Sequence, residues 1–195
     1  MNTSAIILAA GPSSRMGQSK QMLDIDGEKL LVKTIRTILN AGVSSVVVVL
    51  GSDEKKHRDL IKDLPVDIIL NPNWANGMGS SIKTGLQYLT TKNPSLQGVI
   101  VSVCDQPLVS TQNISNLIRR YEETGKPIIA SRYLKIRGVP VLFDKTYFPK
   151  LMALPDDQGA KKIIQQNPED VSEVDFPGGE IDLDTMEDYE AFRNR

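Results

Sequence analysis

The chain has 195 residues and a formal net charge of −1, and 40% of its residues are hydrophobic and 24% charged, as in an ordinary globular domain. Basic residues do not cluster along the sequence. The near-neutral charge and the lack of a basic stripe exclude nucleic acid and an anionic membrane as favoured partners. One cysteine excludes an intrachain disulfide and sites with several thiolates, and one histidine excludes zinc sites with several imidazoles. The short apolar runs, with no basic region before the first of them, predict a cytoplasmic protein.

Strands and helices are predicted to alternate along the chain. Apolar runs rich in Val and Ile predict strands at residues 4–8, 45–50, 66–70, 99–103, 126–130, 139–143 and 171–174. Helical spacing of apolar residues predicts a helix after each of the first four strands, and further helices at residues 147–153, 160–166 and 186–193.

The strand runs are continuously apolar, as in a parallel sheet whose two faces are both covered by helices. We therefore predict an α/β fold with a three-layer, doubly wound and mostly parallel sheet, in a single domain that spans residues 1–195. Residues 132–180 break the regular alternation and are predicted to be an elaboration of this domain that covers a substrate.

A glycine-bearing loop at residues 11–20 follows the first strand and contains Arg15 and Lys20. Such a loop presents backbone N–H groups and positive charge to phosphates. Its glycine spacing matches neither a P-loop nor a dinucleotide fingerprint. A surface loop with chance charges is the alternative, but a loop of this length is more often functional.

The single histidine, His57, lies in a polar segment that predicts the exposed start of a helix. We expect a solvated side chain there and not a catalytic base. Carboxylates, Lys, Arg, hydroxyls and backbone amides remain for catalysis, a set that suits Mg²⁺-assisted phosphoryl or nucleotidyl transfer.

Ligands of parallel α/β sheets bind at the carboxyl ends of the strands, so residues that follow each strand are candidate site residues. After the third strand, glycines and hydroxyls at a helix start, with Ser80 or Ser81 near its N-cap, are suited to a base or ribose; a capped helix without a ligand is the alternative. Asp105 ends the fourth strand and is placed to hold Mg²⁺, although an Asp-x-Pro segment alone is usually a turn.

Asp182 and Asp184 are expected to share one face of a strand near the end of the chain. Either carboxylate completes a metal site with Asp105 in this interpretation, and helix capping by Asp184 or Thr185 is the alternative. Weaker candidates are Cys104 as a small core residue, Trp74 as a stacking or packing ring, and three basic residues that meet an anionic acceptor or are merely solvated: Arg132, Arg137 and Lys161.

Taken in order, segments 8–20, 71–81, 105–107 and 182–188 resemble the MobA-like nucleotidyltransferase family. Within that family, the Ala9-Ala10-Gly11 opening and the segment from Trp74 to Ser81 are most similar to the molybdenum cofactor cytidylyltransferases, the MocA type. The resemblance covers essentially the whole chain, and it implies a Rossmann-like nucleotidyltransferase fold.

The resemblance also implies CTP and Mg²⁺ as substrate and cofactor, and transfer of CMP to the terminal phosphate of molybdopterin with release of pyrophosphate. A molybdoenzyme or its chaperone is the implied further partner. Arg15 and Lys20 would stabilise triphosphate charge, and Asp105 and Asp184 would hold the metal. The implied nucleotide-binding residues are Arg15, Lys20 and Asp105 together with Leu8, Ala9, Ala10, Gly11, Asn71, Gly79, Ser80 and Ser81.

Three positions depart from the family pattern: Asp24 and Met186 each replace a common Pro, and Val139 replaces a frequent His. Because Val139 lies on the presumed pterin side, acceptor identity is the less specific part of this prediction. The alternatives are another small-molecule cytidylyltransferase or sugar-phosphate nucleotidylyltransferase, and a non-catalytic accessory module that binds nucleotide or cofactor.

Overall fold

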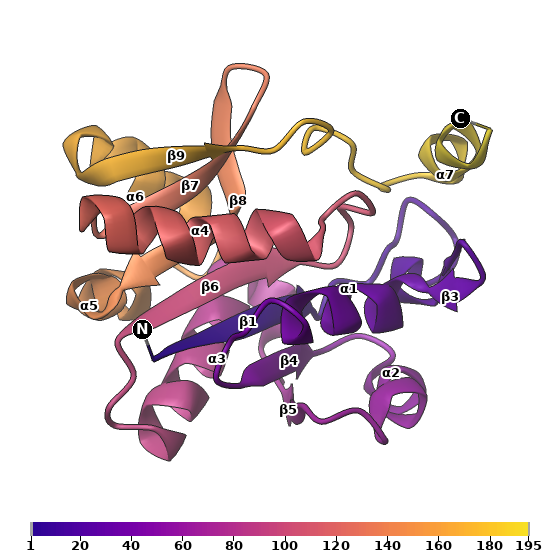
Figure 1. Cartoon of the computed structure of the whole chain (residues 1–195). Coiled ribbons are helices and arrows are strands. Elements are labelled where there is room, and N and C mark those ends of the chain that lie inside the picture. The colour runs from indigo at the N-terminus through magenta and orange to yellow at the C-terminus, as the bar shows by residue number, and fades with distance from the viewer. Residues whose placement is uncertain (1, 195) are drawn as a thin grey trace.

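The computed structural model describes residues 2–194. Its central sheet has seven strands in the order β5-β4-β1-β6-β8-β7-β9, and the α/β, mostly parallel fold is thereby confirmed (Figure 1). The strands are β1 (Thr3–Ala9), β4 (Val46–Leu50), β5 (Asp67–Leu70), β6 (Gly98–Val103), β7 (Ile128–Tyr133), β8 (Ile136–Asp144) and β9 (Val171–Asp175).

Helices cover both faces of this sheet because successive strand residues point to opposite sides, and both sides are apolar. Ile7 belongs to one buried cluster with α1 (Leu30–Leu39), α2 (Glu54–Ile61), α4 (Thr111–Thr124) and α7 (Met186–Arg193). Leu8 belongs to the other, with α3 (Met78–Lys92), α5 (Phe148–Met152) and α6 (Ala160–Gln166). No helix within residues 2–194 has the length and apolar character that crossing a bilayer requires.

The strand β8 lies between β6 and β7 and is antiparallel to both. The strand β7 therefore runs in the direction of β6, so the β7–β8 turn lies at the edge where β1 and β6 end. Residues 132–180 thus contribute β8 and β9 to the sheet itself, and their substrate-covering role stays a prediction.

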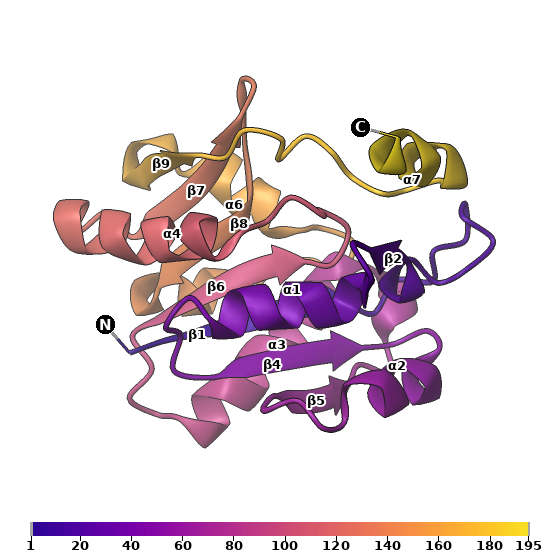
Figure 2. The ribbon, with the colours of Figure 1, turned by 45° about the vertical axis from the view of Figure 1, so that its right-hand side comes forward.

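A small hairpin, β2 (Asp24–Ile25) with β3 (Glu28–Lys29), follows the first loop and was not predicted. The helix α7 lies beside it (Figure 2), and the hydroxyl of Tyr189 donates a hydrogen bond of 2.8 Å to the carbonyl oxygen of Asp24. The end of the chain is thereby attached beside the loop that carries Arg15 and Lys20.

One local prediction is confirmed and another is wrong. The helix α3 begins at Met78 with Gly77 as its N-cap, so Ser80 and Ser81 lie in the first turn, near the N-cap as predicted; Gly77 has a φ of 128°, a conformation that glycine adopts without strain. Asp182 and Asp184 lie in an irregular segment and not on a strand, because Thr185 and Asp188 form a capping box that starts α7 directly after it.

Candidate active site

A cavity of about 430 Å³ opens at the carboxyl ends of β1 and β6. Its size is within the range of small-molecule sites. Apolar strand ends, a helix start and two charged side chains surround it: Leu8, Ala10, Gly11, Pro12, Lys20, Gln21, Trp74, Ala75, Gly77, Met78, Ser81, Val103, Cys104 and Asp105.

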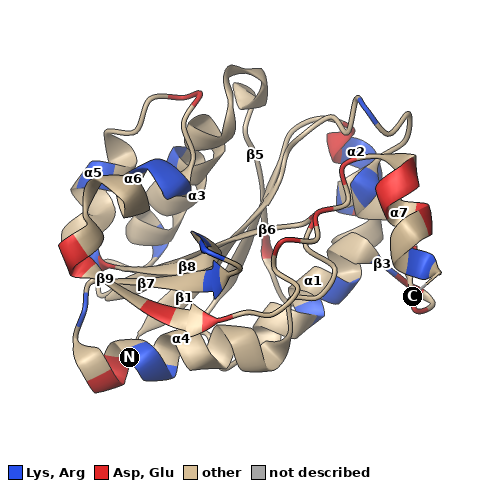
Figure 3. Cartoon of the chain, turned by 90° about the horizontal axis from the view of Figure 1, so that it is seen from above, with Lys and Arg blue, Asp and Glu red and all other residues tan. Residues whose placement is uncertain are grey.

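A compact charged cluster lies at this cavity. The Nζ atom of Lys20 donates to Oδ2 of Asp105 at 2.9 Å and to Oδ1 of Asp184 at 3.1 Å. The Nη2 atom of Arg15 donates to Oδ2 of Asp184 at 2.8 Å. Acidic residues gather along the segment that leads to α7 (Figure 3). Lys20 therefore connects the first loop to the end of β6 and to the start of α7.

The pKa values of Lys20 and Asp184 favour the charged forms of these two side chains. Burial alone would lower the pKa of Lys20, but the charges and hydrogen bonds of Asp105 and Asp184 outweigh burial and raise it. Burial alone would raise the pKa of Asp184, yet Lys20 and Arg15 hold it below the ordinary value. Burial, with the charges of Asp105 and Asp184, raises the pKa of Asp182 to about 6. Of Asp182 and Asp184, it is Asp184 that shares the ammonium group of Lys20 with Asp105.

The carboxylate pair fits one kind of metal site. Within residues 2–194 no group of three or more His, Cys, Asp and Glu side chains is arranged to hold a metal ion. Mg²⁺ is commonly held by one or two carboxylates and completes its coordination with substrate phosphates and water. Asp105 and Asp184 match this pattern, so the donor set suits a Mg²⁺ ion that binds together with a triphosphate.

A chain of hydrogen bonds supports the loop that carries Lys20. The Nε2 atom of Gln21 donates to the carbonyl oxygens of Ala9 at 3.1 Å and Gly11 at 3.3 Å. Its Oε1 atom must therefore face Ser19, whose hydroxyl donates to it at 2.8 Å. Ser19 Oγ also lies 2.6 Å from Nε2 of His57. This short contact joins the imidazole of α2 to the loop that carries Lys20.

The prediction of a solvated His57 is wrong, because the side chain is only 1% exposed. The polar residues of α2 do not all face water; His57 finds its polar partner in Ser19 of the first loop. Burial lowers the pKa of His57 below its ordinary value. The imidazole is thus a neutral group that supports the first loop, residues 11–20, from behind.

A second buried network holds the start of α3. The Nδ2 atom of Asn71 donates to the hydroxyl oxygens of Ser80 at 2.8 Å and Ser81 at 3.0 Å. The hydroxyl of Ser80 donates to the carbonyl oxygen of Gly77 at 2.8 Å. Within residues 2–194 the hydroxyl proton of Ser81 has no acceptor among the protein groups, and Ser81 borders the cavity. Ser81 therefore offers the cavity a hydrogen-bond donor of fixed position.

The structure brings six of the eleven candidate nucleotide-binding residues to the cavity wall: Leu8, Ala10, Gly11, Lys20, Ser81 and Asp105. Others lie behind this wall and support it, namely Ala9, Asn71 and Ser80. Gly79 faces away, because a Cβ atom there would lie 2.2 Å from the carbonyl oxygen of Pro155. Arg15 and Asp184 reach the cluster through their ion pairs.

Sequence reasoning missed the support residues Ser19, Gln21 and His57. The only signal for Gln21 is its place directly after Lys20, and the bonds from Ser19 to His57 and from Gln21 to Ala9 join separate segments of the chain. Trp74 does border the cavity. Cys104 is a buried core residue, as predicted, and burial raises the pKa of its thiol to about 12.

Comparisons with known proteins agree with this geometry. A model of the MobA-like NTP transferase domain matches residues 5–171. The nicotine blue oxidoreductase of Paenarthrobacter nicotinovorans is 30% identical over 93% of this chain and 92% of that protein. The molybdenum cofactor guanylyltransferase of Vibrio atlanticus (strain LGP32) is 29% identical over 97% of this chain and 95% of that protein.

Among solved structures, that of Rv0371c from Mycobacterium tuberculosis H37Rv has a TM-score of 0.87 at 24% identity, and the match covers 100% of this chain and 98% of that one. This likeness shows a common fold. The family model covers most of the chain, including the strand ends and loops around the cavity. The chain therefore belongs to the MobA-like NTP transferase domain family.

Proposed function

We propose that this protein transfers CMP from CTP to the terminal phosphate of a molybdopterin-type acceptor and releases pyrophosphate. The observation that carries the proposal is the contact of Lys20 with both Asp105 and Asp184, at 2.9 and 3.1 Å, beside a cavity of nucleotide size. Family membership supports nucleotidyl transfer, and the relative named a molybdenum cofactor guanylyltransferase supports the acceptor class.

In this reaction the protein must position the two substrates and neutralise the charge of their phosphates. An oxygen of the acceptor phosphate attacks the α-phosphorus of CTP in line, and pyrophosphate leaves. Because that oxygen is already an anion near neutral pH, neither a side-chain nucleophile nor a histidine base is needed. Lys20 and Arg15 neutralise charge that develops on the leaving group, where a well-placed donor is worth about 3–4 kcal/mol.

Asp105 and Asp184 would hold Mg²⁺ together with the triphosphate. When bound, the ion supplies further neutralisation of phosphate charge. A second solved structure of Rv0371c is a complex with manganese, at a TM-score of 0.82, which supports a divalent cation in this fold. A molybdoenzyme or its chaperone is the proposed recipient of the product.

The preference for CTP rests on the wall of the cavity. Ser81 offers a hydroxyl proton, and cytosine presents two acceptors, O2 and N3, on its pairing edge. Guanine presents N–H donors at the corresponding positions, which leave the Ser81 proton without a partner. We expect kcat/KM for CTP to exceed that for GTP at least about tenfold, a difference of roughly 1.4 kcal/mol.

The test measures pyrophosphate release with each of the four common NTPs, with Mg²⁺, in the presence and absence of molybdenum-loaded molybdopterin. The proposal predicts release that depends on both CTP and acceptor, and a cytosine dinucleotide as the product. Predominant guanine dinucleotide would refute the cytidylyl assignment and leave nucleotidyl transfer standing. Nucleotide binding without pyrophosphate release, under any of these conditions, would instead identify a non-catalytic binding module.

A further inference from the structure

The single tryptophan of the chain, Trp74, borders the nucleotide cavity, which is the cavity of about 430 Å³ at the carboxyl ends of β1 and β6. It belongs to η2 (Trp74–Asn76), a one-turn 3-10 helix between β5 and α3. Its side chain is half-buried. An indole ring at the wall of such a cavity is suited to contact the flat face of a ligand. The mechanism described above for nucleotidyl transfer does not use it.

The structure makes room for this ring at Gly51, which directly follows β4. A Cβ atom at Gly51 would lie 2.6 Å from Cγ of Trp74 and 2.7 Å from the carbonyl oxygen of Ala10. Gly51 does not have a positive φ, so close packing and not backbone conformation requires a glycine here. The indole of Trp74 therefore packs on bare backbone between the ends of β1 and β4.

One buried residue, Asn71, positions both Trp74 and Ser81. Its carbonyl oxygen accepts a hydrogen bond of 3.3 Å from the backbone N–H of Trp74, and its Nδ2 atom donates to the hydroxyl oxygen of Ser81 at 3.0 Å. Asn71 is only 1% exposed. The carbonyl oxygen of Trp74 in turn accepts from the N–H of Gly77 at 3.1 Å. An aromatic residue and a hydroxyl donor are thus held by the same residue at the wall of one cavity.

The chemistry of the cavity wall changes from one segment to the next. Lys20 and Asp105 supply charge at the wall, whereas segment 74–81 contains no charged residue. In the part of the chain that the structure describes, the indole N–H of Trp74 forms no hydrogen bond with the protein, so it is free to contact a ligand. Segment 74–81 therefore suits a flat, uncharged group, and the charged residues suit phosphates.

We propose that Trp74 stacks on the base of the bound nucleoside triphosphate and supplies affinity that does not depend on which base is bound. This inference rests on the proposed function, because it assigns the cavity to a nucleotide. Every base has a π face, so stacking accepts cytosine and guanine alike, whereas the hydroxyl of Ser81 contacts only the edge of a base. Trp74 thus sets how tightly a nucleotide binds, and Ser81 sets which nucleotide binds.

The test measures binding of CTP to the full-length protein by calorimetry, with Mg²⁺ and without acceptor. Trp74→Leu keeps an apolar side chain but removes the ring, and it should weaken CTP binding at least about tenfold, which corresponds to about 1.4 kcal/mol. Trp74→Phe is the matched control, since it keeps an aromatic face, and it should stay within about threefold of the wild type. GTP should lose affinity by the same factor as CTP in Trp74→Leu.

A ligand without a base separates stacking from a merely structural role. Inorganic tripolyphosphate should bind equally to the wild type and to Trp74→Leu, because its contacts are with the charged residues. In the unmodified protein, where Trp74 is the only tryptophan, CTP should quench the tryptophan emission and tripolyphosphate should not. Unchanged CTP affinity in Trp74→Leu, an equal loss of tripolyphosphate affinity, or no quenching by saturating CTP would each overturn the inference.

These binding measurements do not depend on turnover. If Trp74→Leu loses affinity for CTP and keeps it for tripolyphosphate, but no NTP yields pyrophosphate with the acceptor, the inference stands and the proposed function fails. If the wild type forms the cytosine dinucleotide and Trp74→Leu binds CTP as tightly as the wild type does, the proposed function stands and the inference fails.

Discussion

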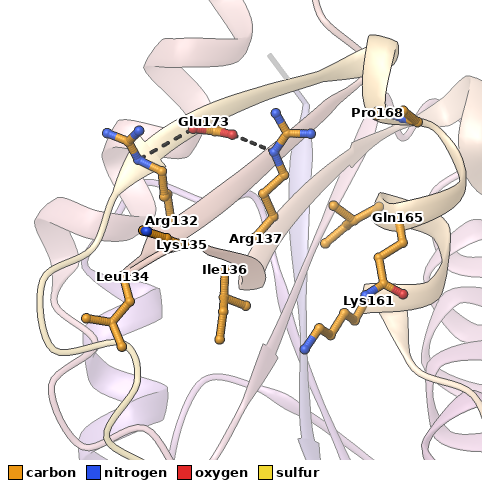
Figure 4. Close-up of a pocket in the computed structure, with 10 residues that line it drawn as sticks. Arg132, Leu134, Lys135, Ile136, Arg137, Lys161, Gln165, Pro168 and Glu173 are labelled. Carbon is orange, nitrogen blue, oxygen red and sulfur yellow. Dashed lines mark hydrogen bonds and ion pairs between the residues drawn. The ribbon is translucent and has the colours of Figure 1, made fainter.

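The nucleotide cavity borders buried strand ends and a hydrogen-bonded loop, whereas a second cavity, of about 620 Å³, borders the β7–β8 turn and α6 (Figure 4). Four cationic side chains line this basic cavity: Arg132, Lys135, Arg137 and Lys161. Around the first, Ser19, Gln21 and Ser81 are 6%, 2% and 3% exposed, and each has a defined hydrogen-bond partner. Around the second, the side chains of Arg132 and Arg137 are 49% and 38% exposed. One cavity is built from fixed groups and the other from side chains that can adjust.

This difference decides which cavity is suited to the reaction. Charge stabilisation during bond cleavage needs groups that are already in place, since reorganisation during the reaction weakens their effect. The nucleotide cavity meets this condition, and the exposed side chains of the basic cavity do not. Substitutions at the first cavity should therefore change kcat or the affinity for the nucleotide, and those at the second should leave both unchanged.

Asp105→Asn should have the largest effect. The substitution preserves shape but removes a charge from the proposed metal pair, so kcat should fall at least about 10³-fold. The melting temperature should change little, because Asp105 lies at the end of a strand and not in its apolar interior. Asp63→Asn, an exposed position after α2, is the control and should retain full activity. Wild-type activity of Asp105→Asn at ordinary Mg²⁺ concentration would end the metal assignment.

Lys20→Met should lower both kcat and kcat/KM for CTP by at least about 10²-fold, the scale of one lost charged donor. It also leaves Asp105 and Asp184 facing each other without their shared ammonium. Lys161→Met, in the basic cavity, is the matched comparison and should leave kcat/KM for CTP unchanged. If Lys20→Met altered thermal stability alone, the first loop would be structural only.

Ser81→Ala should reduce the preference for CTP over GTP from at least about tenfold to a few-fold, because the base loses a buried hydrogen-bond partner. Ser80→Ala is a sharp control, since its hydroxyl donates to Gly77 within the protein. That control should lower stability and leave the preference intact. Both variants are tested by competition between equimolar CTP and GTP, which measures the ratio of cytosine to guanine product. An unchanged ratio in Ser81→Ala would show that Ser81 does not recognise the base.

The smallest predicted effect is the contribution of His57 to the pH dependence of the free energy of unfolding. Burial lowers its pKa, so the unfolded chain binds a proton there at a higher pH than the folded chain does. The resulting stabilisation is complete above the unfolded pKa of about 6.5 and is lost as the pH falls toward the lower pKa of the folded state. The contribution of His57 to the free energy of unfolding changes by at most about 1.4 kcal/mol per pH unit.

Denaturant unfolding of the wild type and His57→Gln between about pH 8 and pH 5 measures this contribution. The free energy of unfolding should fall more steeply for the wild type as the pH decreases. Parallel curves would show that the imidazole is not held neutral behind the first loop.

The sequence predicted most of the sheet and the last two helices, because continuous apolar runs and helical spacing report burial directly. Helices at 160–166 and 186–193 match α6 and α7. The antiparallel position of β8 could not be predicted, since an apolar run does not encode the direction of its neighbours. Candidate residues that directly follow strand ends, such as Asp105, were correctly predicted to lie together at the cavity. His57 was missed because a polar segment suggests water as its partner, and here the partner is Ser19.

The central claim is that the bond between the α- and β-phosphates of CTP breaks beside Lys20, Asp105 and Asp184. The most direct measurement follows radioactive phosphorus placed at either the α or the γ position of CTP, with molybdenum-loaded molybdopterin as acceptor. The account predicts α-label in a cytosine dinucleotide and γ-label in pyrophosphate, and neither product with Asp105→Asn. Release of γ-label as inorganic phosphate, or α-label recovered only as CTP or free CMP, would contradict it.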